Sequence, residues 1–306
     1  MARLAVLVPG GTGQLGSDLA AGGERSGDEV LVRAASSAEL DVTQPGAVIE
    51  AVTELTETAR ADGRFPVVVN AAAYTAVDAA EDNEDRAFAV NADGPRVLAA
   101  VCSSRRVPLV HVSTDYVFAG DADTPYEPDA PLAPRSAYGR TKAAGEDAVL
   151  GSGARAWIVR TAWVYGATGS NFVKTMARLE REREHLSVVD DQRGSPTWSA
   201  DLAGGLLELA ARIAEGSAPR QRILHCTGGG DTTWYGFARA IFEELGADPD
   251  RVRPCTTEEF PRPAPRPAYS VLSDAAWRAA GLTPLRPWRE ALSAFVAERR
   301  DALVVS

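Results

Sequence analysis

The chain has 306 residues, of which 45% are hydrophobic and 24% charged, so it is long and apolar enough to bury a substantial core. Its 42 acidic residues outnumber its 32 lysines and arginines, which gives a formal net charge of −10. This acidic balance argues against nucleic-acid binding, because phosphate contacts normally require a basic face.

Cysteines and histidines are few and scattered. The three cysteines show no C-x-x-C spacing, and such an odd, sparse set is typical of reduced thiols, so we expect a cytoplasmic protein. The three histidines show no metal-ligand spacing, and no metal site is predicted. His111 and His225 lie in apolar runs, where we expect structural side chains.

Short aliphatic runs alternate with helix-like segments such as Phe88–Arg105. Near-continuous apolarity is typical of strands covered on both faces, so the alternation predicts an α/β fold with a Rossmann-type, doubly wound parallel sheet. The first run is far shorter than the roughly 20 residues that span a bilayer, and no membrane contact is expected. The expected strands are Leu4–Val8, Glu29–Arg33, Val67–Asn70, Leu109–Ser113, Ala156–Arg160 and Ile223–Cys226.

The alternation of strand-like and helix-like segments becomes irregular after about Thr161. Asp190–Trp198 and the proline-rich Pro254–Pro267 are predicted loops, and loops on a rigid sheet often carry binding groups. We therefore expect a dinucleotide-binding domain over residues 1–162, with 199–226 returning to it. A smaller C-terminal substrate-binding cap would comprise residues 163–198 and 227–306.

A glycine-rich turn, Gly10-x-x-Gly13-x-x-Gly16, follows the first predicted strand and opens the first helix. The first glycine permits a tight turn, the second lets the backbone approach a pyrophosphate, and the third lets helix and strand pack closely. Backbone N–H groups at the helix N-terminus would then face the phosphates. An ordinary tight turn is the alternative, but the strand before and the helix after favour a dinucleotide site that includes Gln14 and Leu15.

The end of the second strand bears on which dinucleotide binds. An arginine there favours the 2′-phosphate of NADPH, whereas an acid favours the 2′-hydroxyl of NADH. Arg33 is expected to end this strand, which favours NADPH, and Asp41 with Val42 is expected at the adenosine. NADH stays open, because a solvated Arg33 is an equal alternative.

Tyr138 and Lys142 are predicted to share one face of a helix over Ser136–Leu150, with Ser136 as N-cap and Gly151 at its end. A nearby ammonium lowers the pKa of a phenol from its usual value near 10, which would suit Tyr138 to acid–base work. A chance pair on a solvated helix is the alternative.

The run Ser113–Phe118 argues against chance. It begins where the fourth strand ends, at the edge where open α/β sheets place their ligands. Thr114 in this run is suited to donate a hydrogen bond to a substrate carbonyl oxygen and stabilise the charge that develops there. Together these motifs predict a nicotinamide-dependent carbonyl reductase.

The chain resembles the extended short-chain dehydrogenase/reductases, and within them the dTDP-4-dehydrorhamnose reductases. The resemblance covers almost the whole chain and depends on several motifs occurring together. These are Gly10–Gly16, Asn70–Asp78, Asn91, Val112–Phe118, Tyr138–Lys142, Arg160–Tyr165, Asp191–Thr197 and Arg266-Pro267.

The resemblance implies that Thr114, Tyr138 and Lys142 form a catalytic triad. Tyr138 would protonate the C4 oxygen of a dTDP-4-keto-6-deoxyhexose as NADPH or NADH delivers hydride to C4, giving dTDP-L-rhamnose, while Lys142 also holds the nicotinamide ribose. It further implies a cofactor groove lined by Ala71, Ala72, Ala73 and Asn91. Contacts to the dTDP-sugar are implied for Asp115, Tyr116, Trp163 and Arg266, with Lys174 and Arg178 as further candidates.

Two alternatives stay open. One is reduction of a related dTDP-sugar, such as the precursor of dTDP-dihydrostreptose. The other is a cofactor-binding regulatory subunit, like the β subunit of methionine adenosyltransferase, although an intact triad argues against it. Some family members bring carboxylates together around magnesium at a dimer interface. Ser17 and Asp18 stand where one such acid is sought, the set is not matched, and a homodimer is left open.

Overall fold

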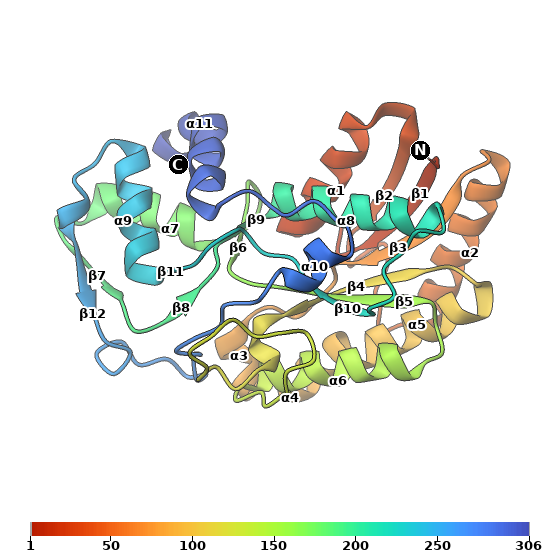
Figure 1. The fold of residues 1–306 in the computed structure, drawn as a ribbon, viewed down its shortest axis with the longest axis horizontal. Helices are drawn as coiled ribbons and strands as arrows, with labels where there is room; N and C mark the ends of the chain where they lie inside the picture. The colour runs from red at the N-terminus through yellow and green to blue at the C-terminus, as the bar shows by residue number, and fades with distance from the viewer. Residues whose placement is uncertain (1, 306) are drawn as a thin grey trace.

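The computed structural model describes residues 2–305, and a parallel sheet of six strands lies at its centre (Figure 1). The strand order is β10-β5-β4-β3-β1-β2, and all neighbouring pairs are parallel. The six strands expected from the apolar runs are all present, each within two residues of its predicted bounds. They are β1 (Leu4–Pro9), β2 (Val30–Ala35), β3 (Phe65–Asn70), β4 (Leu109–Thr114), β5 (Ala156–Thr161) and β10 (Ile223–His225).

The order of the strands reverses at β1, because β2 lies on one side of it and β3, β4 and β5 on the other. The predicted doubly wound, Rossmann-type sheet is thereby confirmed. The carboxyl ends of β1 and β3 form its switch point, which is where open α/β sheets bind ligands.

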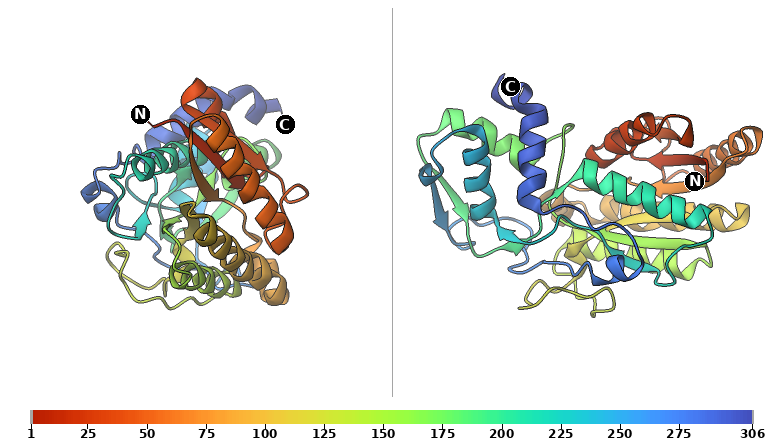
Figure 2. Two further views of the ribbon diagram at one scale, coloured as in Figure 1. Left: turned by 90° about the vertical axis from the view of Figure 1, so that its right-hand side faces the viewer. Right: turned by 45° about the horizontal axis from the view of Figure 1, so that its top comes forward.

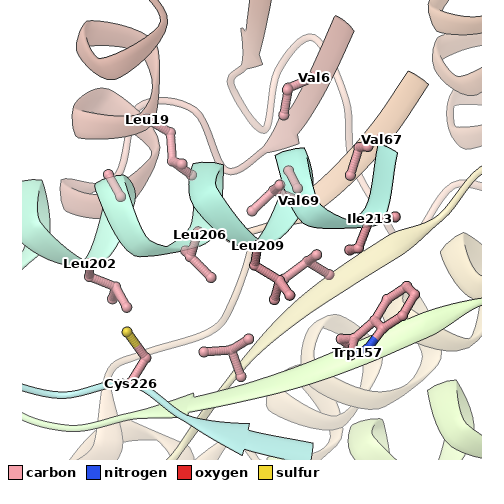
Figure 3. Close-up of a cluster of buried hydrophobic side chains, with 14 of the residues drawn as sticks. Val6, Leu19, Val67, Val69, Trp157, Leu202, Leu206, Leu209, Ile213 and Cys226 are labelled. Carbon is pink, nitrogen blue, oxygen red and sulfur yellow. The ribbon is translucent and has the colours of Figure 1, made fainter. Parts of the chain in front are cut away.

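Helices cover both faces of this sheet. Leu4, Val6 and Val8 of β1 point to one face, where they pack under α1 (Gln14–Arg25) and α8 (Ser199–Ala214), as Figure 3 shows for Val6, Leu19 and the leucines of α8. Ala5 and Leu7 point to the opposite face, which is covered by α2 (Pro45–Ala61), α5 (Gly94–Arg105) and α6 (Ala137–Gly151). Apolar runs were therefore a sound signal for the inner strands, whose two faces are buried, whereas the edge strand β2 exposes Leu31 and Arg33.

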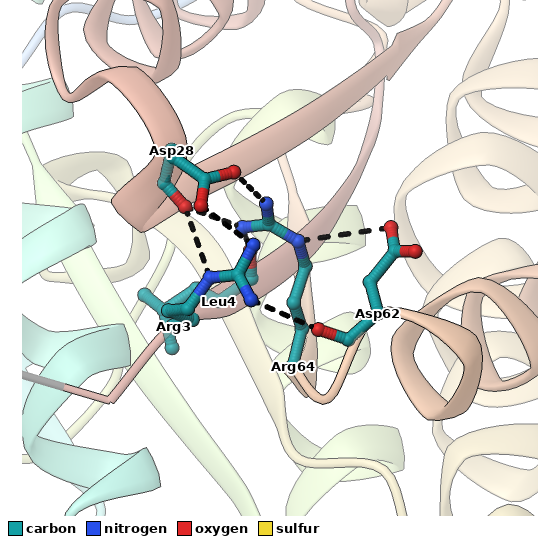
Figure 4. A network of polar contacts seen from close by, with 5 residues as sticks. All are labelled: Arg3, Leu4, Asp28, Asp62 and Arg64. Carbon is teal, nitrogen blue, oxygen red and sulfur yellow. Dashed lines mark hydrogen bonds and ion pairs between the residues drawn. The ribbon is translucent and has the colours of Figure 1, made fainter.

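The amino ends of the strands carry an ionic network instead of a site (Figure 4). Asp28 accepts hydrogen bonds from Arg3 at 2.7 Å and from Arg64 at 2.6 Å. Arg3 precedes β1, Arg64 precedes β3, and Asp28 lies in the short 3₁₀ turn Gly27–Glu29 before β2. These contacts fasten three neighbouring strands at the edge opposite the switch point.

The remainder of the chain forms a second, more irregular region with its own hydrophobic core, here called the cap (Figure 2). Three helices supply most of this core: α7 (Phe172–Glu182), α9 (Trp234–Leu245) and α11 (Trp288–Val305). Short strands pair between them. They are β6 (Val164–Tyr165) with β9 (Thr197–Trp198), β8 (Arg193–Gly194) with β11 (Thr232–Thr233), and β7 (Leu186–Val189) with β12 (Val252–Cys255).

Three segments between these elements matter for the site. The chain from β3 to α5 forms α3 (Val77–Asp82), α4 (Glu84–Phe88) and a π-helical turn (Ala89–Asp93), so the predicted helix Phe88–Arg105 is interrupted near its start. A 3₁₀ turn, Asp115–Val117, follows β4. Another 3₁₀ turn, Pro249–Arg251, precedes β12.

The division into domains stays a prediction. Residues 199–226 do lie on the main sheet, since α8 packs on it and β10 pairs with β5. Trp277 of α10 (Ala275–Ala279) and Leu282 also pack in the sheet's core, so part of residues 227–306 contacts the Rossmann half. Within residues 2–305, every helix falls short of the length or apolarity that a bilayer crossing requires.

Candidate active site

The glycine turn has the geometry of a phosphate-binding loop. A Cβ on Gly16 would lie 2.2 Å from the Gly10 carbonyl oxygen, and one on Gly10, whose φ is +81°, would lie 2.7 Å from the Ala72 nitrogen. A Cβ on Gly13 would meet a single protein atom within 4 Å, at 3.3 Å. The fold itself therefore requires the first and third glycines, whereas the second is left open toward a ligand. Among the described residues, no side chain caps α1 at this end.

The adenosine end of the groove differs from the prediction. Strand β2 continues to Ala35, so Arg33 does not end it, and its guanidinium pairs with Glu54 of α2 on the half-exposed face. Asp41 accepts from the backbone nitrogen of Thr43 at 2.9 Å, which caps the start of the following turn. Val42 is buried beside Gly94. The sequence analysis ended this strand two residues too early because Arg33 is polar and exposed, although the strand continues through Ala34 and Ala35.

The loop after β3 carries Ala71–Ala73, and Asn91 fixes its shape. The side-chain oxygen of Asn91 accepts from the Tyr74 nitrogen at 2.8 Å, and its amide donates to the Tyr74 carbonyl and to Thr141 of α6, both at 3.1 Å. Asn91 is fully buried, and its side chain holds the loop that carries Ala71–Ala73. That it lines the cofactor groove stays a prediction. It lies in the π-helical turn, whose bulge brings its carbonyl so close to α6 that only Gly145 fits there.

Thr114 ends β4 at the carboxyl edge of the sheet. Its hydroxyl donates to a carboxylate oxygen of Asp115 at 3.0 Å and accepts from the Tyr116 nitrogen at 3.2 Å. Both Thr114 and Asp115 are buried. Burial raises the pKa of Asp115 to about 6, although hydrogen bonds from Ser270 and Thr114 act to lower it. The proton of Thr114 is thus directed at Asp115 in this state, and not toward the groove.

Helix α6 presents Tyr138 and Lys142 as the spacing predicts, beginning after Ser136, whose hydroxyl accepts from the Gly139 nitrogen at 3.1 Å. The ammonium of Lys142 is buried and donates to the Val112 carbonyl of β4 at 2.7 Å. Burial lowers the pKa of Lys142 to about 8, while the charge of Glu146 acts to raise it.

The expected effect of Lys142 on Tyr138 is not found. Burial raises the pKa of Tyr138 to about 12, and a hydrogen bond with Thr114 only partly opposes this shift. The prediction of an acidified phenol is wrong for this state, because desolvation outweighs an ammonium that is directed at a backbone carbonyl. Tyr138 is therefore protonated at neutral pH, which is the form that a proton donor needs.

A small pocket opens beside these groups. Tyr116, whose ring meets that of Tyr138 edge-on at 5.6 Å between centroids, lines it together with Arg266. The other residues in its wall are Phe118, Ala119, Arg135, Ser136, Pro265 and Pro267. The structure thus brings Thr114, Asp115, Tyr116, Tyr138 and Arg266 together, although Arg266 comes from a distant loop.

Trp163 follows β5 and is held in place from both sides. Its indole stacks on that of Trp234 of α9, with centroids 3.5 Å apart, and a Cβ on Gly194 would lie 2.5 Å from its ring. Its backbone has a φ of +48°, in the left-handed region. The sequence analysis missed Trp234, and no local pattern points to it.

Lys174 and Arg178, the further candidates for contacts to the dTDP-sugar, line a different hollow, between α7 and α11.

A fully buried ion pair lies one turn beyond Lys142 on α6. Glu146 accepts from Arg160 of β5 at 2.6 Å, and both side chains are 1% exposed. The same arginine donates to the Pro128 carbonyl at 3.0 Å. The spacing of Tyr138, Lys142 and Glu146, four residues apart each time, was the available signal for this third member of the face.

Residues 2–305 contain no group of three His, Cys, Asp or Glu side chains placed to hold a metal ion. The carboxylate of Asp18 on α1 accepts from the Ser199 hydroxyl, and burial raises the pKa of Asp18. Cys102 and Cys226 are buried, and His111 and His225 are buried in β4 and β10 as structural side chains.

Comparison with known proteins decides the family. A family model described as the RmlD substrate binding domain matches residues 4–300. A dTDP-4-dehydrorhamnose reductase of Mycobacterium tuberculosis is 48% identical over 297 residues, covering 95% of this chain and 92% of that protein. The chain belongs to the dTDP-4-dehydrorhamnose reductase family. It is an NAD(P)H-dependent oxidoreductase, which confirms the resemblance seen in the motifs.

Two further relatives of this reductase family are informative. A crystal structure of dTDP-4-dehydrorhamnose reductase from Bacillus anthracis in complex with NADP has a TM-score of 0.85 at 35% identity, covering 97% of this chain and 99% of that one. A probable dTDP-4,6-dihydroxy-2-methyloxan-3-one 4-ketoreductase of Streptomyces antibioticus is 50% identical over 288 residues, covering 94% of this chain and 92% of that protein. Within one family, similar identity thus accompanies different sugars.

Proposed function

We propose that this chain reduces the C4 keto group of dTDP-4-dehydrorhamnose with NADPH, giving dTDP-L-rhamnose. One observation carries the proposal: a protonated Tyr138 lies beside Thr114 at the carboxyl edge of the sheet, on the helix that also carries the buried Lys142. The glycine turn at the same edge supports the cofactor, because no side chain caps α1 among the described residues, which leaves the first N–H groups of this helix available to phosphates.

The nicotinamide cofactor supplies the hydride that reaches C4. As the carbonyl π bond breaks, negative charge develops on the C4 oxygen, and Tyr138 donates its phenolic proton to that oxygen. A phenol with a pKa near 12 is a weak acid toward water, but an alkoxide is more basic still and accepts this proton readily. The high pKa therefore suits reduction, since it keeps the proton on Tyr138 until charge appears.

Thr114 and Lys142 prepare Tyr138 for this step. The Thr114 hydroxyl donates to Asp115 and accepts from the Tyr116 nitrogen in this state. Turning its proton to the phenol oxygen would orient Tyr138 and stabilise the phenolate that proton transfer leaves. The ammonium of Lys142 uses one donor on the Val112 carbonyl, and the resemblance implies that another would bind the nicotinamide ribose. We infer that Lys142 keeps this positive charge at neutral pH, because its pKa is about 8.

The nucleotide sugar would lie against Tyr116 and Arg266, whose hollow of about 10 Å³ has room for about one water molecule and not for the whole substrate. Arg266 supplies a positive charge for the diphosphate, and Trp163, supported by Trp234, supplies an apolar wall for the sugar.

We also infer a cytoplasmic enzyme, in keeping with its unpaired thiols. A homodimer stays a prediction, which measurement of the molecular mass in solution would test.

Purified protein, NADPH and a panel of dTDP-4-keto sugars test the proposal. We expect NADPH oxidation with dTDP-4-dehydrorhamnose and dTDP-L-rhamnose as the product. A second candidate is reduction of another dTDP-keto sugar, which the Streptomyces antibioticus relative favours, and a higher kcat/KM with that sugar would establish it. If none of the sugars causes NADPH oxidation, the proposed function is wrong.

A further inference from the structure

The proline-rich segment Pro254–Pro267 connects the cap to the Rossmann half. Near its start, the Thr257 nitrogen donates to the Asp191 carboxylate at 2.8 Å, and Gln192 donates to the Thr257 hydroxyl at 2.9 Å. From β12 the segment runs past α3 toward α10 (Figure 1). It is therefore fastened to the cap at one end and reaches the active-site pocket at the other, where Pro265, Arg266 and Pro267 line the wall.

A single carboxylate receives the far end of this segment. Asp78, in the first turn of α3, accepts from Arg262 at 2.6 and 3.1 Å, from the Ala264 nitrogen at 3.3 Å, and pairs with Arg266 at 2.9 Å. These residues are 184 to 188 positions away in the sequence. Burial acts to raise the pKa of Asp78, but these donors hold it below its ordinary value, so the carboxylate is ionised at neutral pH.

The two arginines differ in exposure and in their contacts. Arg262 donates through two nitrogens to one oxygen of Asp78, and its side chain is 45% exposed. Arg266 uses one nitrogen on the other oxygen, is 15% exposed, and lines the pocket beside Tyr116. A second nitrogen of Arg266 donates to the Ala264 carbonyl at 3.0 Å. Arg135, the other arginine of the pocket wall, pairs with Asp121 and is 58% exposed. Asp78 thus fixes the direction of the more buried of the two guanidinium groups at the pocket.

We propose that Asp78 is a positioning residue for the nucleotide sugar: it holds the proline-rich segment against α3 and directs Arg266 at the site of the substrate diphosphate. This rests on the proposed function. Arg262 has a separate role in this arrangement. When Arg266 contacts the diphosphate, Asp78 still has Arg262 as its counter-ion. An unpaired carboxylate would otherwise face the phosphates and repel them.

Two effects of removing the charge of Asp78 oppose each other. Loss of a nearby carboxylate makes the pocket more positive, which favours an anion. Loss of the contacts leaves the segment and the Arg266 side chain free to move. Binding is then weaker, because the entropy lost when they become ordered has to come out of the binding free energy. Charge effects at a partly exposed site are screened by salt. We expect the loss of positioning to be larger.

The variant Asp78→Asn tests this, with calorimetric binding of dTDP as a readout that needs no turnover. We expect the Kd for dTDP and the KM for the keto sugar to rise about tenfold, a change of about 1.4 kcal/mol. The kcat and the KM for NADPH should stay within about twofold, and Asp78→Glu should restore part of the loss, since the acceptor is retained.

Glu84→Gln is the control, because it removes another ion pair of a short helix near Asp78, between Glu84 of α4 and Arg140 of α6, without touching the pocket. It should leave dTDP binding unchanged. An unchanged or tighter Kd in Asp78→Asn, or an equal loss in Glu84→Gln, overturns the proposal. Failure of the proposed function looks different: the unaltered protein would oxidise no NADPH with any keto sugar, whatever Asp78→Asn does to dTDP binding.

Discussion

The Rossmann half and the cap are built in contrasting ways. In the Rossmann half, continuous apolar strands are covered on both faces, and polar groups appear where the strands end. In the cap, two-residue strands and an aromatic core hold loops that come from distant parts of the sequence. The contrast suggests a division of labour in which the first region binds the cofactor and supplies the proton, and the second recognises the sugar nucleotide.

The largest expected effect falls on the Rossmann half. Tyr138→Phe removes the proton donor and should lower kcat by about 10²- to 10⁴-fold, the range of general acid catalysis. Binding of NADPH, followed by its fluorescence, should change little. Turnover close to that of the unaltered enzyme would mean that another group protonates the C4 oxygen.

The glycines offer a matched pair within the same region. Gly16→Ala places a Cβ 2.2 Å from the Gly10 oxygen and should lower the free energy of unfolding by about 1–3 kcal/mol or more. Gly13→Ala puts its Cβ 3.3 Å from the Gly10 oxygen, a tight contact that a small shift relieves, so it should cost much less stability than Gly16→Ala. It should still weaken NADPH binding by about tenfold, because the backbone can no longer approach the pyrophosphate. Equal NADPH affinity in Gly13→Ala would place the phosphates elsewhere.

Activity should also depend on the protonation of Lys142. With a pKa of about 8, its ammonium persists below that pH and loses its proton above it, so kcat/KM should fall about tenfold per pH unit on the alkaline side. The unfolded chain holds this proton up to a pKa near 10.5, so the buried charge of Lys142 costs stability below pH 8, and this cost is relieved as the pH rises from about 8 to 10.5. A rate that stays flat to pH 10 would contradict this role.

A substitution in the cap should weaken binding of the nucleotide sugar and not of NADPH. Trp234→Ala removes the indole that stacks on Trp163 and should raise the KM for the nucleotide sugar about two- to tenfold, with NADPH binding unaltered. Tyr235→Ala serves as the control, because Tyr235 is the next residue of α9 and its ring contacts Arg239 instead. If Trp234→Ala weakens NADPH and leaves the sugar's KM unchanged, the division between the two regions fails.

The smallest effect is expected at Arg33. It pairs with Glu54 on a half-exposed face, so Arg33→Ala should weaken NADPH relative to NADH only about two- to fivefold. Equal changes in the two Kd values would show that Arg33 does not contact the 2′-phosphate.

The sequence predicted what depends on local periodicity. Burial on both faces makes β1 and β4 visible as apolar runs, and a helical repeat puts Tyr138 and Lys142 on one face. It did not predict that Lys142 donates to the Val112 carbonyl, or that burial raises the pKa of Tyr138. Both depend on how a helix packs against a strand and on how much water it excludes.

Contacts between the Rossmann half and the cap could not be predicted from the sequence either. Asp78 and Arg266 are 188 residues apart, and their charges do not single them out among the 74 acidic and basic residues of the chain, 42 plus 32. The motif around Asn91 likewise did not predict that its side chain joins the loop after β3, at Tyr74, to Thr141 of α6.

A crystal structure with NADP⁺ and a dTDP-sugar tests the central claim most directly. We predict that the Tyr138 hydroxyl lies within about 3 Å of the sugar's C4 oxygen, with the nicotinamide ring facing C4. A phenol far from that oxygen, or a sugar bound away from the carboxyl edge of β4, would contradict the account.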